Sequence, residues 1–151
     1  MIGLYKKILV PFDNTIQSNS ALRHAYRMAI AFRASVTLFH VVPCKASVDA
    51  KKGGTNGLKR TDSIRENKAR AKLILEQLKR SFSNLDVKIN VDVAIGKHSN
   101  EVCKKAKIEG YDLIVMGSRG LGKIHDLLGG SVSSKVSSNA PCPVILIHTA
   151  N

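Results

Sequence analysis

The sequence predicts a single α/β domain in which a doubly wound parallel sheet carries helices on both faces. Short runs rich in β-branched residues alternate along the chain with longer segments that have an apolar face at helical spacing. Parallel strands need helical crossovers and are buried on both faces, which this alternation supplies. At 151 residues the chain has the length of one domain with a substantial core.

Five segments have the length and composition of buried strands. They are residues 7–11, 35–42, 87–93, 112–116 and 144–148. Four helices are expected between them, because apolar residues recur at helical spacing across residues 21–32 and 71–82, and more weakly across about 99–109. The fourth helix begins near Gly130 and ends before Pro141, whose ring restricts the preceding residue to extended geometry.

Residues 43 to about 60 interrupt this alternation of predicted strands and helices. They combine glycines and lysines with almost no apolar anchor, so we expect a flexible basic loop within the single domain of residues 1–151.

The segment from Gly117 to Ser131 carries the strongest functional signal. Gly117 and Gly120 follow a buried strand, and glycine lets the backbone turn and come close to a ligand. Nine residues separate Gly120 from Gly130. Gly130 and Ser131 then open a helix whose first N–H groups and positive dipole end suit an anion. The spacing therefore predicts a phosphate cradle.

Two commoner glycine motifs do not fit this segment. Residues 117–123 nearly match a Walker A loop, but Ile124 occupies the position where that loop needs Ser or Thr to hold Mg²⁺. The dinucleotide fingerprint fails because His125 stands where its last glycine belongs.

Together with three other stretches, this segment resembles the universal stress protein family, in particular its ATP-binding branch. The resemblance covers nearly the whole chain and rests on residues 7–13, 38–42, 112–120 and 140–147. It implies a Rossmann-like sheet of order 3-2-1-4-5, similar to the adenine nucleotide alpha hydrolases. Ligands of such sheets bind where the strand order reverses, here between the first and fourth strands.

The same resemblance assigns roles at that crevice. Asp13 would bind ribose hydroxyls or an adenine amine, although an Asp at this place can also cap a helix. Val41 would form an apolar wall for adenine, and the bulk of Phe12 would narrow the slot. Ser131 and Ser133 would bind phosphate, although serines at a helix start are commonly caps. The expected nucleotide-binding residues are Pro11, Phe12, Asp13, Val41, Met116, Gly117, Arg119, Gly120, Gly130, Ser131, Val132 and Ser133.

The expected ligand is ATP, with AMP or ADP as alternatives, and with Mg²⁺ carried on the phosphates. The family resemblance implies a regulatory role in the stress response through nucleotide-dependent conformation and dimerisation, with a protein partner that the sequence does not identify. A slow ATPase is the alternative, but Asp13 is assigned to the nucleoside and no acidic pair stands ready to hold a metal.

The net charge of +13 raises a second alternative, a basic module that binds nucleic acid or other anions. Residues 45–80 hold 11 of the 24 Lys and Arg side chains against four acids, without interleaved aromatic residues for base stacking. This distribution favours a solvated basic face and argues against a nucleic-acid partner.

The remaining features concern location and assembly. No apolar run approaches the roughly 20 residues that span a membrane, and the three cysteines lack paired spacing, so we expect a cytoplasmic protein. Residues 143–148 form an apolar strand at a sheet edge, and the resemblance implies a homodimer that pairs through it.

Overall fold

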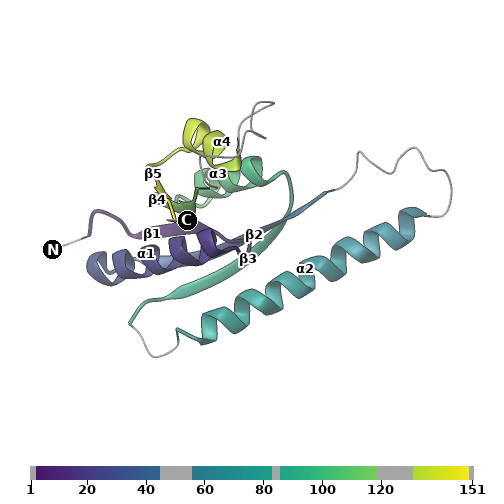
Figure 1. Cartoon of the computed structure of the whole chain (residues 1–151), viewed down its shortest axis with the longest axis horizontal. Helices are drawn as coiled ribbons and strands as arrows, with labels where there is room; N and C mark the ends of the chain where they lie inside the picture. Colours follow the sequence, from purple (N-terminus) through teal and green to yellow (C-terminus); the bar gives the residue numbers. More distant parts are fainter. Residues whose placement is uncertain (1–2, 45–55, 83–85, 119–130, 150–151) are drawn as a thin grey trace.

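The computed structural model describes residues 3–44, 56–82, 86–118 and 131–149. Strands and helices alternate along them (Figure 1). Their bounds are β1 Lys7–Pro11, α1 Ile16–Phe32, β2 Ser35–Pro43, α2 Asn56–Arg80, β3 Ile89–Gly96, α3 His98–Ile108, β4 Leu113–Gly117, α4 Val132–Asn139 and β5 Val144–Ile147.

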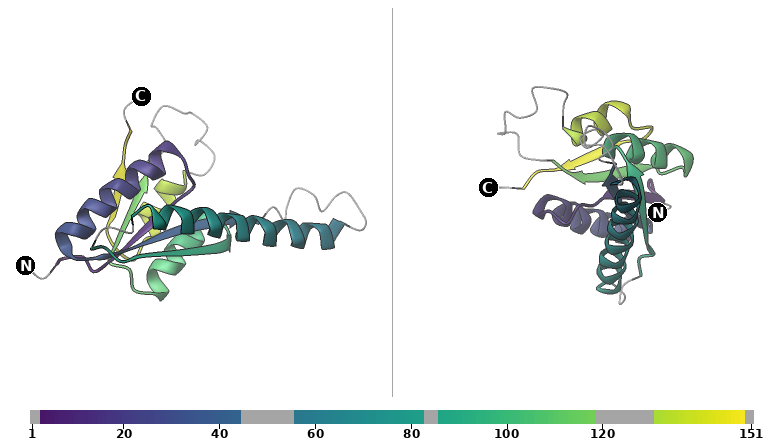
Figure 2. Two further views of the ribbon diagram at one scale, coloured as in Figure 1. Left: turned by 90° about the horizontal axis from the view of Figure 1, so that it is seen from below. Right: turned by 90° about the vertical axis from the view of Figure 1, so that its right-hand side faces the viewer.

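The strands form one parallel sheet in the order β3-β2-β1-β4-β5, which confirms the predicted fold class. Helices α1 and α2 cover one face and α3 and α4 cover the other (Figures 1 and 2). The order reverses between β1 and β4, because β1 pairs with β2 on one side and with β4 on the other. The carboxyl ends of β1 and β4 therefore meet at one edge of the sheet.

Two apolar clusters sandwich the sheet, and β1 contributes to both. Ile8 and Val10 face α1 and α2, whereas Leu9 faces α3 and α4, as the two-residue period of a strand requires. All three side chains are fully buried. This central strand holds the turn that follows Pro11 in a fixed position.

Several boundaries differ from those that the sequence predicts. Strand β3 runs to Gly96 rather than ending at 93, and β2 runs to Pro43, because these two strands continue to pair up to their last residues. Helix α2 begins at Asn56, inside the segment expected to be a loop up to about residue 60. Residues 45–55 of that expected loop lie outside the described residues.

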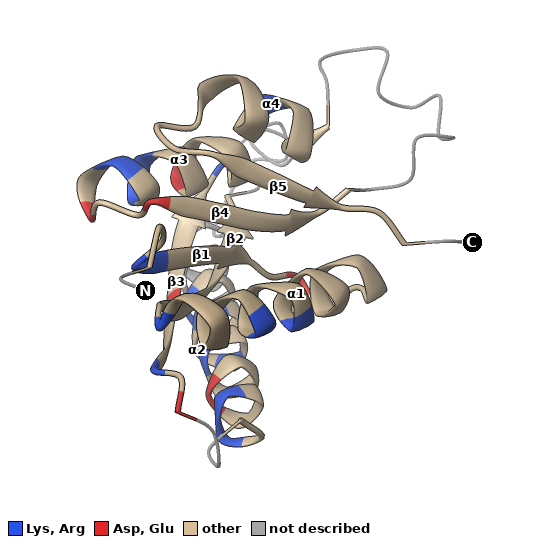
Figure 3. Ribbon diagram, turned by 90° about the vertical axis from the view of Figure 1, so that its left-hand side faces the viewer, with Lys and Arg blue, Asp and Glu red and all other residues tan. Residues whose placement is uncertain are grey.

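Helix α2 is 25 residues long and extends well past the end of the sheet (Figure 2). Of its described side chains, only Leu75 is buried. Most of its length therefore gains little from packing, and basic residues recur along it (Figure 3). In the part of the chain that the structure describes, no helix is both long and apolar enough to cross a lipid bilayer.

Candidate functional site

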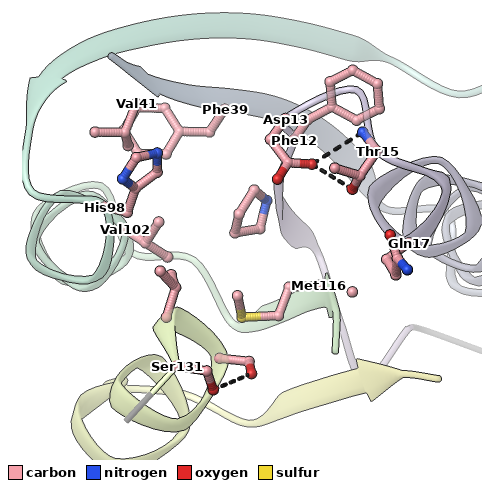
Figure 4. Close-up of a pocket in the computed structure, with 14 residues that line it drawn as sticks. Phe12, Asp13, Thr15, Gln17, Phe39, Val41, His98, Val102, Met116 and Ser131 are labelled. Carbon is pink, nitrogen blue, oxygen red and sulfur yellow. Dashed lines mark hydrogen bonds between the residues drawn. The ribbon is translucent and has the colours of Figure 1, made fainter. Parts of the chain in front are cut away.

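A pocket opens beyond the carboxyl ends of β1 and β4 (Figure 4). It takes in about 630 Å³ of space, a figure that includes solvent at its open mouth. The residues around it are Pro11, Phe12, Asp13, Thr15, Gln17, Phe39, Val41, His98, Val102, Met116, Gly117, Ser131, Val132 and Ser133.

The structure brings together all the predicted site residues that it describes. These are Pro11, Phe12, Asp13, Val41, Met116, Gly117, Ser131, Val132 and Ser133. Arg119, Gly120 and Gly130 lie outside the described residues, as do Lys123 and His125 on the same segment.

The turn after β1 places Asp13 at the pocket. Asn14 adopts a left-handed conformation with φ of 62°. The Asp13 Oδ1 atom accepts hydrogen bonds from the Thr15 N–H at 3.1 Å and the Thr15 hydroxyl at 2.5 Å (Figure 4). Thr15 is the N-cap of α1 and accepts from the Ser18 N–H, so the capping role considered for Asp13 belongs to Thr15. Asp13 instead stabilises the turn, and its carboxylate lies among the residues of the pocket.

The backbone of Phe12 is fixed from both sides by β2. Its N–H donates to the Phe39 carbonyl and its carbonyl accepts from His40 Nδ1, both at 2.8 Å. Its side chain belongs to the apolar cluster under α1 and α2 and is 4% exposed. The bulk of Phe12 is therefore accommodated in the core, which corrects the expectation that it would narrow the slot.

Gly117 is required by the packing of β4 against α1. A Cβ atom at this residue would lie 2.6 Å from the Gln17 Cβ and 2.7 Å from the Gln17 carbonyl carbon. The approach of a ligand was the reason expected for this glycine, but the close neighbour is the first turn of α1. The consequence for the site is indirect, because this contact sets how near α1 comes to the end of β4.

Apolar side chains from three elements form one wall of the pocket. Val41 is 2% exposed and packs in the cluster under α3 and α4, together with Phe39, Val102 and Met116. Val41 is thus both a core valine and a pocket residue. Such a wall suits a flat, uncharged ring system.

The first residues of α4 form the opposite side. The Ser131 hydroxyl accepts from the Ser134 N–H at 3.1 Å and lies 2.9 Å from the Ser133 hydroxyl (Figure 4). The first N–H groups of a helix lack partners within the helix, and the dipole gives this end partial positive charge. The cap and the anion-binding roles are therefore compatible here.

Several residues around the pocket were not predicted from the sequence, notably His98, Gln17 and Phe39. His98 is the first residue of α3, directly after β3. Helices that follow parallel strands begin at the edge of the sheet where ligands bind. The position of His98 could have been inferred from this rule, but β3 was predicted to end at residue 93, three residues before its observed end at Gly96.

A second concavity lies towards the amino ends of the strands, where charged groups satisfy one another. Lys105 pairs with Asp92 at 2.6 Å and Glu109 at 2.5 Å, and the Tyr111 hydroxyl donates to Thr37 at 2.9 Å. Burial lowers the pKa of Lys105, but the hydrogen bonds to the two carboxylates outweigh it and raise the pKa above its ordinary value. The role of this cluster is structural. Among the described residues, no group of three or more His, Cys, Asp or Glu is placed to hold a metal ion.

Comparison with known proteins identifies the family. The model of the universal stress protein family matches residues 4–148. The universal stress protein MJ0531 of Methanocaldococcus jannaschii is 33% identical over 145 residues, which cover 96% of this chain and 83% of that protein. The protein YxiE of Bacillus subtilis is 31% identical over 148 residues, which cover 96% of this chain and 100% of that protein.

Solved structures show the same fold. The M. jannaschii protein MJ0577 superposes with a TM-score of 0.79 at 26% identity, covering 98% of this chain and 99% of its own. An Arabidopsis thaliana family member with AMP bound has a TM-score of 0.67 at 23% identity, covering 96% and 92%. Another, in complex with cAMP, has the same TM-score at 20% identity, covering 97% and 98%. Because the family model spans residues 4–148 and relatives match along almost the whole chain, this protein belongs to the universal stress protein family.

Proposed function

We propose that this protein binds an adenine nucleotide, with ATP as the expected ligand, in the pocket beyond β1 and β4. One observation carries the proposal. Residues from β1, β2, β4 and α4 that are far apart in the sequence gather around one pocket with an apolar wall, a carboxylate and a helix N-terminus. These are the three kinds of group that a base, a ribose and a phosphate chain need.

Each part of a nucleotide has a matching part of the pocket. The adenine ring would lie against Val41 and Met116, where buried apolar surface excludes water. Ribose hydroxyls would donate to the Asp13 carboxylate. The phosphates would accept from the N–H groups and hydroxyls of Ser131 and Ser133, at the positive end of α4. Any Mg²⁺ would be carried on the phosphates.

The AMP-bound and cAMP-bound neighbours show that proteins of this fold accommodate adenine nucleotides. Their identities to this chain are 23% and 20%, so the support for a nucleotide here comes chiefly from its own pocket. ATP, ADP and AMP therefore belong in the same experiment.

The experiment has two steps. Freshly purified protein is denatured, and any released nucleotide is identified by mass spectrometry. The emptied, refolded protein is then titrated with Mg-ATP, Mg-ADP and AMP by calorimetry. We expect saturable binding near one nucleotide per chain, with ATP or ADP preferred. A folded protein that binds none of the three would contradict the proposal.

We propose in addition that the protein has a regulatory role in the stress response and that it dimerises through residues 143–148. Strand β5 lies at an edge of the sheet and is apolar throughout. The Pro143 carbonyl accepts from the Ile114 N–H of β4, and the Ile147 carbonyl accepts from the N–H of Ser118, just after β4. By strand alternation the N–H of Leu146 therefore points to the open side. That open side would pair with the same strand of a second copy in antiparallel fashion.

Light scattering at about 10 μM tests the dimer. We expect twice the chain mass of 16.4 kDa. Leu146→Pro would remove an outward N–H and leave a folded monomer, because proline is tolerated on edge strands. A monomeric wild-type protein would contradict the dimer, and the calorimetric result would still stand by itself.

A further inference from the structure

A groove between β2 and α2 lies on the other side of the Phe12–Asn14 turn from the pocket. Two adjoining hollows make it, and both include His40, Ala71 and Ile74. We call it the α2 groove and define it by His40, Val42, Asn67, Arg70, Ala71 and Ile74. All of these lie in the described residues.

The α2 groove exists because α2 diverges from the sheet. Leu75 is buried against the core, but the neighbouring Ile74 is 43% exposed and Leu73 is 64% exposed. The short side chain of Ala71 leaves room beside Ile74. Two consecutive aliphatic side chains of α2 thus remain in contact with water, and one of them, Ile74, lines both hollows.

The charge around the α2 groove has one dominant sign. Residues 63–80 of α2 carry six cations, Arg65, Lys68, Arg70, Lys72, Lys79 and Arg80, against two acids, Glu66 and Glu76. Arg70 lies at the groove itself, three residues from Leu73 and four from Ile74. Residues at these spacings are neighbours on a helix surface, so the exposed aliphatic side chains flank a guanidinium.

We propose that the α2 groove docks an acidic, amphipathic segment of a partner protein. An apolar side chain of that segment fills the hollow against Ile74 and Ala71, and its carboxylates pair with Arg70 and the neighbouring cations of α2. Guanidinium and carboxylate groups form paired hydrogen bonds, and complementary charge also speeds association. One of its two hollows also touches Phe12 and Asp13 of the proposed nucleotide site, whereas Arg70 and Ile74 lie outside that site.

An apolar hollow distinguishes this partner from a nucleic acid. A phosphate backbone is bound through cations and other hydrogen-bond donors, with an affinity that falls steeply with salt, and it has no apolar part to cover the exposed Ile74 and Leu73 side chains. Single-stranded nucleic acid stacks on exposed aromatic side chains. The aromatic residue that lines the two hollows, Phe12, is only 4% exposed and packs in the core, so it offers no such platform. The observations therefore favour a protein segment.

The test uses the full chain and a phage-displayed library of random 16-residue peptides. Enriched peptides are synthesised with a fluorescent label and titrated by anisotropy against the wild type, Arg70→Glu and Ile74→Glu. Lys107→Glu and Ile108→Glu serve as matched controls, because both residues are exposed on α3, far from the groove in sequence and on the other face of the sheet. A labelled oligonucleotide of 20 thymidines is titrated in parallel.

We expect enriched peptides that combine acidic and apolar residues. They should bind Arg70→Glu and Ile74→Glu at least tenfold more weakly than the wild type, and bind both α3 variants as the wild type does. Failure to enrich any such peptide, or equal binding to all variants, would overturn the proposal. So would an oligonucleotide whose binding depends on Arg70 and Ile74 while no peptide does.

Discussion

The nucleotide pocket and the α2 groove, which lie on either side of the Phe12–Asn14 turn, are built in different ways. The pocket collects backbone turns and helix ends from β1, β2, β4 and α4, so the topology of the sheet fixes its shape. The α2 groove arises between two elements that are consecutive in the chain, and depends on how large the side chains at Ala71 and Ile74 are. The comparison separates a site that the fold itself creates from one that individual side chains create.

The largest expected effect is on the pocket, from Ser131→Asp. Aspartate is as good an N-cap as serine, so α4 should still form. Its charge would repel a bound phosphate, and a loss of about 100-fold in ATP affinity, or roughly 2.7 kcal/mol, is within the range of a like-charge contact at short distance. Calorimetry measures it.

Ser131→Asn is the matched control, since asparagine is also a good N-cap and has the size of aspartate but carries no charge. Its ATP affinity should fall far less than that of the Asp variant, because only the donated hydrogen bond of the Ser131 hydroxyl changes. Equal affinities for the Asp and Asn variants would place the phosphates elsewhere.

The next effect is on stability, and concerns the packing of β4 against α1 beside the pocket. Gly117→Ala would push a methyl group into the Gln17 backbone, whose carbonyl carbon would lie only 2.7 Å from the added atom. Overpacking of this kind costs about 1–3 kcal/mol of unfolding free energy. Urea denaturation measures it, and stability equal to that of the wild type would show that α1 is free to move away from β4.

A smaller effect should follow from Asp13→Asn. The amide oxygen still accepts from Thr15 and keeps the turn, but the ribose loses a charged acceptor. We expect calorimetry to show about tenfold weaker ATP binding, or roughly 1.4 kcal/mol.

Dideoxy-ATP, which lacks both ribose hydroxyls, sharpens this test. The wild type should bind dideoxy-ATP more weakly than ATP. The Asp13→Asn variant should bind the two nucleotides with similar affinity, because its weakened contact with the ribose leaves little to lose when the hydroxyls are absent. A loss for Asp13→Asn that is the same for ATP and dideoxy-ATP would exclude the ribose hydroxyls as partners of Asp13.

The smallest effect expected is that of the α2 variants on the nucleotide. Arg70→Glu and Ile74→Glu should change the affinity for ATP less than about twofold, since both side chains lie outside the pocket. A tenfold loss in calorimetry would mean that the phosphates bind the basic helix. The alternative of a general anion-binding module would then be preferred.

The sequence predicted the features that depend on periodicity and on glycine. Buried strands such as β1 and β4 have short apolar runs, and their positions were found to within a residue or two. The family resemblance supplied the strand order, and that order brought Asp13 and Ser131 to one pocket. Both inferences need only local pattern and topology.

Features that depend on packing were beyond such reasoning. The start of α2 at Asn56 was missed because the protruding half of the helix has few apolar residues to mark a face. The side chain of Phe12 was assigned to the pocket, but it packs in the core under α1 and α2. The contact of Gly117 with Gln17 joins two elements about 100 residues apart, and no local pattern reports it.

One measurement tests most directly whether the pocket, and not the basic helix, holds the nucleotide. Two-dimensional ¹⁵N–¹H NMR spectra of the emptied protein would be recorded during a titration with Mg-ATP. We predict shifts at Asp13, Val41, Gly117 and Ser133, with Arg70 and Ile74 unchanged. Shifts centred on residues 63–80 of α2, with the pocket residues unmoved, would contradict this account.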